Sequence, residues 1–306
     1  MVMKISLRAI LIAAAVSALP ATAIAAGGKA LDYKHNHWHF SGPFGAYDKE
    51  AMQRGFQVYR TVCASCHGVD ELSFRNLGDK GGPFHLDACP AEVPATTACS
   101  KPSENPVVKA IAAEYEVTDG PDDSGDMFKR PGLPSDKIPG PYANEQQARA
   151  ANGGAYPPNL ALIMKARHHG PDYVYSLLTG YEAAPASVTL GAGQHYNPYF
   201  AGDMSQLLKP EYRDEEGHPL DGVEIPPGGV LAMAPPLSDG IIDYADDSVP
   251  ETADQYAKDV VEFLTWASEP KMEQRKSLGV ITMGYLLILT LILFFSYRAI
   301  WSKTDH

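Results

Sequence analysis

Five residues near the start of the chain have the types and the spacing to do chemistry together. Cys63-Ala64-Ser65-Cys66-His67 is a Cys-x-x-Cys-His motif, which is the attachment signature of a c-type haem. On one helical turn, Cys63 and Cys66 can reach the two vinyl groups of a single porphyrin, and His67 can direct its imidazole at the iron. The motif therefore predicts one covalently bound haem c with His67 as an axial ligand.

Two other chemistries also use a pair of cysteines at this spacing. A redox dithiol contains Cys-x-x-Cys, and so does half of a zinc site, but a zinc ribbon needs a second close pair. The remaining cysteines, Cys89 and Cys99, are ten positions apart. The sequence therefore favours haem over a dithiol or zinc.

The second axial ligand decides whether such a haem transfers electrons or catalyses a reaction. An open position suits gas binding or peroxide chemistry, whereas a histidine–methionine pair gives a high-potential electron carrier. Met233 is the preferred ligand, because Pro235 and Pro236 stiffen the loop that follows it. Met204 is its main rival. The other downstream candidates are Met127, Met164, His168, His169 and His195.

Helical patterns flank the motif and close the domain. Apolar residues at three- and four-residue spacing predict helices over 47–62, about 160–179 and 253–267. Strand signals are confined to short pieces near 188–190 and 223–225, and the chain between is rich in Pro and Gly. We expect a mostly α fold with extensive loops, the plan of a class I cytochrome c, in which the haem supplies much of the core.

The two ends of the chain have the patterns of membrane targeting. Residues 1–26 join a basic start, an apolar stretch and a small-residue cleavage site, which is typical of a signal peptide and places a domain at 27–270 outside the cytoplasm. Residues 278–297 contain no charged side chain and are long enough to cross a bilayer core of about 30 Å. The sequence predicts a single-pass anchor at 271–298 and a cytoplasmic tail at 299–306.

The charge of the chain is strongly negative. The whole sequence carries −12, the signal adds two positive charges and the segment from Lys271 onward a net three, so the domain between them carries −17. Such a surface repels nucleic acid and attracts basic partners. Six acidic residues crowd one stretch: Glu114, Glu116, Asp119, Asp122, Asp123 and Asp126.

Long segments of the chain, in order, resemble one known family. They lie at 54–67, 119–121, 127–132, 148–160, 166–181, 196–200, 233–236 and 257–260. Over Arg54 to Trp266 the chain resembles cytochrome c1 of the bacterial type, the membrane-anchored haem subunit of ubiquinol–cytochrome c reductase (the cytochrome bc1 complex).

The resemblance implies roles for individual residues. Met233 lies in the Met-Ala-Pro-Pro motif that supplies the sixth ligand, so the iron ligands would be His67 and Met233. Arg167 matches an arginine that pairs with a haem propionate, which a guanidinium can grip with two hydrogen bonds. Three further positions match the haem pocket: Asn152, Pro158 and Tyr173.

The resemblance also implies a place in electron transfer. The chain would take electrons from the Rieske iron–sulfur protein, stand beside cytochrome b, and pass electrons to a basic soluble cytochrome c docked on the acidic stretch. The quinol chemistry would belong to other subunits. The haem domain would lie in the periplasm, anchored in the bacterial inner membrane.

Two alternatives and two insertions remain to be considered. The chain could be a stand-alone membrane-anchored cytochrome c that delivers electrons to a terminal oxidase, or a haem enzyme such as a peroxidase, although only one haem motif is present.

Segments 80–106 and 202–229 resemble insertions of bacterial family members. In an oxidising compartment, Cys89 and Cys99 of the first insertion are expected to form a disulfide.

Overall fold

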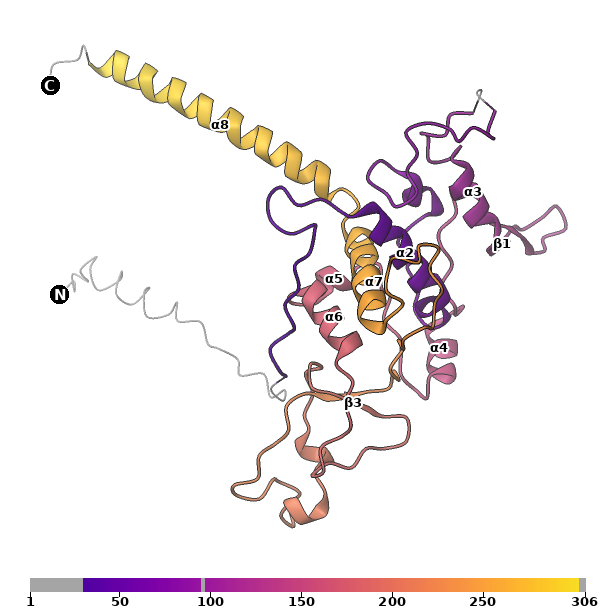
Figure 1. Ribbon diagram of the computed structural model, residues 1–306, viewed down its shortest axis with the longest axis vertical. Helices are drawn as coiled ribbons and strands as arrows, with labels where there is room; N and C mark the ends of the chain where they lie inside the picture. The colour runs from indigo at the N-terminus through magenta and orange to yellow at the C-terminus, as the bar shows by residue number, and fades with distance from the viewer. Residues whose placement is uncertain (1–29, 95–96, 303–306) are drawn as a thin grey trace, which may run out of the picture.

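The computed structural model describes residues 30–94 and 97–302, in which helices and long loops form a domain and a projecting C-terminal helix (Figure 1). The mostly α fold with extensive loops is therefore confirmed. The signal peptide predicted at 1–26 lies outside the described residues.

The centre of the domain is the packing of α2 (Lys49–Thr61) against α7 (Ala253–Ser268). These elements match the helices predicted at 47–62 and 253–267. Asp48 caps α2 by accepting a hydrogen bond from the Ala51 N–H, and Thr252 caps α7. Their facing sides bury the aromatic residues Phe56, Tyr59, Phe263 and Trp266.

A close backbone approach and an ion pair fix where the two helices cross. A Cβ atom on Gly55 would overlap the carbonyl oxygen of Asp259, so only glycine lets α7 come this near. One residue earlier, Arg54 donates two hydrogen bonds to the buried Asp259 carboxylate, at 2.8 and 3.0 Å. The Tyr244 hydroxyl donates to the same carboxylate at 2.8 Å.

The helix predicted at 160–179 is interrupted. It consists of α5 (Ile163–Ala166) and α6 (Gly170–Thr179), which pack on each other and on α7. The break has a backbone cause, because His169 has a left-handed φ of 51° and Gly170 lies against the Met164 carbonyl group. Helical periodicity alone could not show this turn.

Short elements follow the haem motif. Three-residue-per-turn helices cover Cys63–Ser65 (η1) and Phe74–Gly78 (η2). Helices α3 (Pro106–Ala113) and α4 (Glu145–Ala151) were not expected from the sequence. Strands β1 (Glu116–Asp119) and β2 (Phe128–Pro131) form an antiparallel hairpin that carries most of the acidic stretch.

The two insertions adopt different structures. In the first, the expected disulfide between Cys89 and Cys99 is confirmed. The second lies in a lobe with its own small core of Val188, Tyr196, Met204 and Leu208.

The strands of this lobe differ from the prediction. They are β3 (His195–Asn197) and β4 (Gly229–Leu231), which pair antiparallel, and η3 (Ser205–Leu207) and η4 (Pro210–Tyr212) lie between them. The strand predictions at 188–190 and 223–225 were wrong. Val188 forms only an isolated β-bridge with Leu208, because the neighbouring segment does not continue the pairing.

The C-terminal helix α8 (Met272–Trp301) leaves the domain and is the one helix of the described residues that is long and apolar enough to cross a membrane. Its most apolar window is not buried in the domain. The helix confirms the apolar span predicted from the sequence and extends three residues into the predicted tail.

The first turns of α8 are held by the leader to α2. Lys276 Nζ donates to the carbonyl oxygens of Phe40 and Gly45 at 2.6 and 3.0 Å, and the Tyr47 N–H donates to Glu273 at 2.8 Å. The domain therefore sits on the anchor through specific contacts rather than through a free linker.

Candidate functional site

The Cys-x-x-Cys-His motif forms one tight turn at the end of α2. The N–H groups of Cys66 and His67 both donate to the Cys63 carbonyl oxygen, at 3.1 and 2.9 Å. Cys63 and Cys66 are half-buried free thiols, although the same domain holds a disulfide elsewhere. Two unjoined thiols and an imidazole thus project from a single turn.

The imidazole of His67 is oriented by the segment before α5. Its Nδ1 lies 2.7 Å from the Pro158 carbonyl oxygen, which can only accept, so Nδ1 carries the proton and donates. The lone pair of Nε2 is then left for a metal. Burial lowers the pKa of His67, while the hydrogen bond to Pro158 acts in the opposite direction. The neutral imidazole that iron ligation requires is therefore favoured.

The surroundings of the cysteines argue against the two other chemistries considered. Burial, followed by the neighbouring Cys66, raises the pKa of the Cys63 thiol to about 12. A reactive dithiol needs a lowered thiol pKa. Across residues 30–94 and 97–302, no three His, Cys, Asp or Glu side chains are grouped to hold a metal.

The segment that carries Pro158 is fastened to the motif and to α4. The Leu160 N–H donates to the Gly68 carbonyl oxygen at 2.8 Å, which keeps this segment against the motif. Asn152 ends α4, and its amide nitrogen donates to Ala148 O at 2.7 Å and Tyr142 Oη at 2.9 Å. Pro158 therefore contacts His67 directly, whereas Asn152 fixes the start of the loop that carries Pro158.

Arg167 and Tyr173 lie together where α5 and α6 meet. Tyr173 is buried on α6 and packs edge-on against Tyr33, with ring centroids 5.5 Å apart. Burial raises the pKa of Tyr173, and a hydrogen bond with Arg167 opposes that effect. Arg167 is exposed and makes no ion pair with any described carboxylate. Its guanidinium is available to an anionic group.

Met233 lies two residues after β4, and its backbone is held by Tyr181, two residues after α6. The Tyr181 hydroxyl donates to the Met233 carbonyl oxygen at 3.0 Å. The rival Met204 is fully buried in the core of the second lobe, where its side chain fills space. Of the other methionines, Met164 is buried in the main core and Met127 is exposed on the hairpin. Met204 therefore serves the packing of its lobe, and Met233 stays the predicted sixth ligand.

The donor set fits a haem c. It offers two free thiols on one turn, a neutral imidazole with one nitrogen occupied, a thioether in a stiff loop, and an arginine without a carboxylate partner. The residues that would hold the group are Cys63, Cys66, His67, Arg167 and Met233.

Two tyrosines contribute to this arrangement in ways that sequence reasoning missed. Tyr59 lies on the buried face of α2 and donates its hydroxyl to the His67 carbonyl oxygen at 3.1 Å. Tyr181 stands 52 positions before the residue whose carbonyl it binds. The apolar pattern predicts burial of Tyr59, but no local signal reveals either hydrogen bond.

Comparison with known proteins agrees with this geometry. The model of the "Cytochrome C1 family" matches residues 38–304. A "Cytochrome c1" of Rhodospirillum rubrum is 38% identical over 315 residues, covering 98% of both chains. "Cytochrome c1 1, heme protein, mitochondrial" of Arabidopsis thaliana is 43% identical over 266 residues, which are 87% of this chain and 71% of that protein. A "Cytochrome b/c1" of Bradyrhizobium diazoefficiens is 40% identical over 88% of this chain, which spans 35% of that longer protein. With a family match over most of its length and relatives at this identity, the chain belongs to the cytochrome c1 family.

Proposed function

We propose that this chain binds one haem c covalently and carries electrons from a Rieske iron–sulfur protein to a soluble cytochrome c, as the haem subunit of a cytochrome bc1 complex. The observation that carries the proposal is the single turn that presents two free thiols beside a His67 imidazole whose Nδ1 is bonded to Pro158. Such a turn provides both attachment points and one iron ligand.

When bound, the haem supplies a one-electron redox couple, and the residues of the chain adjust its properties. His67 and Met233 would both ligate the iron, and an iron with both ligands would have no open site for substrate. Arg167 would pair with a haem propionate through the two donors of its guanidinium. Asn152, Pro158 and Tyr173 line the pocket and hold these groups in place.

Two features of the relatives and of the fold support a place in the complex. The names of the relatives include "heme protein" and "Cytochrome b/c1". Helix α8 is held to the domain by Lys276 and Glu273, which fits a fixed position beside cytochrome b and within reach of a Rieske protein. The haem domain lies in the periplasm, and α8 crosses the bacterial inner membrane once.

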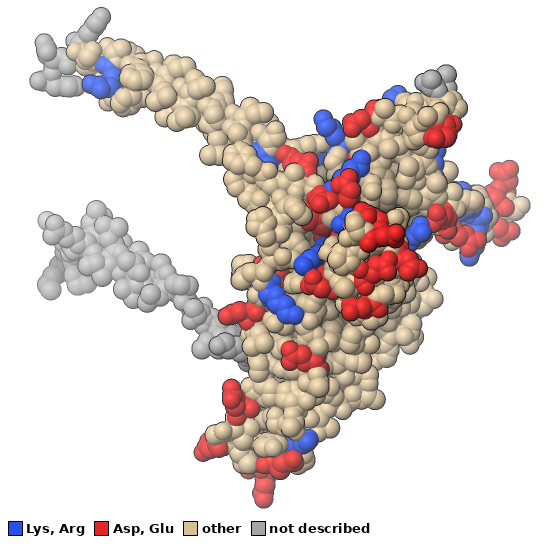
Figure 2. Space-filling view, viewed as in Figure 1, with Lys and Arg blue, Asp and Glu red and all other residues tan. Residues whose placement is uncertain are grey.

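The acceptor is a basic soluble cytochrome c that docks on acidic surface. Along the β1–β2 hairpin and just before it, three of the acidic residues pair with cations: Glu114 with Arg60, Glu116 with Lys129 and Asp119 with Arg130. Figure 2 shows acidic side chains gathered around α2 and this hairpin. Within this acidic stretch, the carboxylates that pair with no described cation lie at the hairpin tip, at Asp122, Asp123 and Asp126.

At the tip, backbone hydrogen bonds favour the ionised form of the Asp122 carboxyl. Backbone N–H groups of Asp126 and Ser124 lower the pKa of Asp122. The side chains of Asp123 and Asp126 form no ion pair with the described residues. A basic partner is therefore steered toward this loop.

Haem attachment is tested by denaturing gel electrophoresis with haem staining. Wild type should keep its haem after denaturation, whereas the double variant Cys63→Ala/Cys66→Ala should lose it. The matched control Cys89→Ala/Cys99→Ala removes two cysteines outside the motif and should keep the stain. Haem retained without Cys63 and Cys66 would rule out thioether attachment at this turn.

The place in the complex is tested by purification from a native membrane. The chain should copurify with a cytochrome b and a Rieske protein in equal amounts. A chain that instead purifies alone and reduces a terminal oxidase would support the stand-alone membrane-anchored cytochrome.

A further inference from the structure

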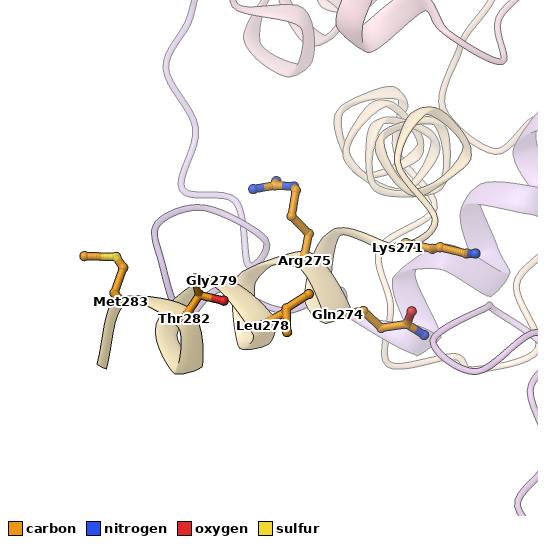
Figure 3. Close-up of a pocket in the computed structure, with 7 residues that line it drawn as sticks. All are labelled: Lys271, Gln274, Arg275, Leu278, Gly279, Thr282 and Met283. Carbon is orange, nitrogen blue, oxygen red and sulfur yellow. The ribbon is translucent and has the colours of Figure 1, made fainter. Parts of the chain in front are cut away.

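The start of α8 has an open groove where the domain meets the membrane. Its volume is about 590 Å³, and Figure 3 shows the side chains that line it. Those residues recur on one side of the helix at three- and four-residue spacing. They are Lys271, Gln274, Arg275, Leu278, Gly279, Thr282 and Met283.

The end of the groove nearest the domain is cationic. Lys271 is exposed and forms no ion pair with the described residues. Arg275 donates its Nε to Glu269 at 2.5 Å, but that carboxylate is shared with Lys165 at 3.3 Å. Two cations therefore share one carboxylate, Arg275 at Oε1 and Lys165 at Oε2, and Lys271 adds a further positive charge. These residues precede the uncharged run at 278–297, so they lie at headgroup level.

The other end of the groove is apolar and open. Leu278 and Met283 are 65% and 73% exposed. Between them, a Cβ atom on Gly279 would meet nothing within 4 Å, so the missing side chain leaves a channel along the helix. Farther along α8, the Thr290 hydroxyl donates to the Leu286 carbonyl oxygen. This bond satisfies a polar group that would lie in the hydrocarbon of the membrane.

We propose that this groove binds an anionic phospholipid from the leaflet on the haem-domain side of the membrane. Its phosphate accepts from Lys271, Gln274 and Arg275, and one acyl chain follows the channel past Gly279 to Met283. The groove is cationic at the end nearest the domain and apolar farther along α8. This order matches the anionic headgroup and the acyl chains of such a lipid. A partner transmembrane helix packed here would instead bury Lys271 without a counter-charge, which is costly. The proposal rests on α8 crossing the membrane and is independent of how the haem is bound.

The charged end is tested with the full-length haem protein in nanodiscs of equal parts phosphatidylglycerol and phosphatidylcholine. Lipids retained on release are counted by native mass spectrometry. Wild type should retain phosphatidylglycerol preferentially. In Lys271→Gln/Arg275→Gln this preference should fall about fivefold per charge removed. The control Lys101→Gln/Lys109→Gln makes the same change in net charge away from α8 and should keep the wild-type preference.

The apolar end is tested with a pair of glycine substitutions. Gly279→Leu fills the channel and should reduce retention of phosphatidylglycerol. A Cβ on Gly284 also meets nothing within 4 Å, but this residue lies about 140° around the helix, so Gly284→Leu should leave retention unchanged. Circular dichroism and haem absorbance check that each variant is folded.

Three results would overturn the proposal. The first is an unchanged lipid preference in Lys271→Gln/Arg275→Gln, and the second is an equal loss in the control that removes Lys101 and Lys109. The third is a photo-crosslinker at position 283 that, in the assembled complex, joins a helix of another subunit instead of lipid.

Discussion

At the scale of single residues, the candidate site depends on hydrogen bonds to backbone carbonyl groups. Pro158 accepts from His67, the His67 carbonyl accepts from Tyr59, and the Met233 carbonyl accepts from Tyr181. The bonds from Pro158 and Tyr181 come from segments distant in sequence. The bond from Tyr59 comes from α2, the helix that leads into the motif. These bonds restrain the orientation of the His67 imidazole and the backbone on either side of it, and they restrain the loop that carries Met233.

Loss of the Tyr181 hydroxyl should loosen the Met233 loop. Tyr181→Phe removes one hydrogen bond, worth about 1 kcal/mol, so an added ligand such as imidazole should displace Met233 at about fivefold lower concentration. The measurement is an imidazole titration followed by haem absorbance. Tyr196→Phe is the matched control, because its hydroxyl donates to Pro227 in the second lobe. Equal shifts in both variants would show that Tyr181 has no specific role.

Sequence reasoning predicted these residues unevenly. Cys63, Cys66 and His67 follow from spacing alone, because attachment to one porphyrin is a local requirement. Composition does not distinguish Arg167 from other exposed cations, so only the family resemblance predicts its role. Tyr181 could not be predicted, since its contact with Met233 joins distant segments through a tertiary turn.

At the scale of elements, the contact of α2 with α7 holds the haem motif to the rest of the domain. Gly55→Ala places a Cβ atom against the Asp259 carbonyl and must push the helices apart. We expect a loss of about 2–4 kcal/mol in the free energy of unfolding. Denaturant titration followed by circular dichroism measures it. Glu50→Ala, at an exposed position of α2, should change it by less than about 0.5 kcal/mol. A similarly small loss for Gly55→Ala would contradict the close approach.

A buried carboxyl at the same contact should make stability depend on pH. Burial, followed by the nearby charges of Asp48 and Asp259, raises the pKa of Glu262 to about 7, although the Asp48 N–H donates to it at 3.0 Å. Between about pH 4.5 and 7, Glu262 is therefore protonated in the folded state and ionised in the unfolded chain. Stability from this group is complete below that window and falls as pH rises through it.

The Glu262 effect is isolated by comparing unfolding free energies at pH 5 and pH 8. Glu262→Gln keeps an oxygen that can accept from the Asp48 N–H. From pH 5 to pH 8, its free energy of unfolding should fall by about 2–3 kcal/mol less than that of wild type. The exposed Glu50→Gln variant should follow the wild-type curve. A wild-type curve parallel to that of Glu262→Gln would rule out titration of Glu262.

Helices could be predicted from sequence where their apolar faces are long, as in α2 and α7. The broken helix α5–α6 and the short helices α3 and α4 could not, because a left-handed His169 and an Asn105 cap act over single residues. The strands failed for a related reason. Three-residue strands such as β3 depend on the partner that lies beside them, and periodicity does not show that partner.

At the scale of the whole molecule, the negative surface should control the rate of electron transfer to a basic acceptor. Asp123→Asn/Asp126→Asn should lower the association rate several-fold at low salt and flatten its dependence on ionic strength. Glu215→Gln/Glu216→Gln removes the same charge from the second lobe and should have little effect. Stopped-flow kinetics with a basic cytochrome c measures both. Equal slowing in the two variants would indicate a general charge effect instead of a docking site at the hairpin tip.

The central claim is that a haem held by Cys63, Cys66 and His67 takes Met233 as its second axial ligand. The most direct measurement is a redox titration, with visible spectra, of wild type beside Met233→Leu. Wild type should show a low-spin haem of high potential with the weak long-wavelength methionine–iron band, and Met233→Leu should lose the band and have a lower potential. A Met233→Leu protein with an unchanged low-spin spectrum and an unchanged potential would contradict the account.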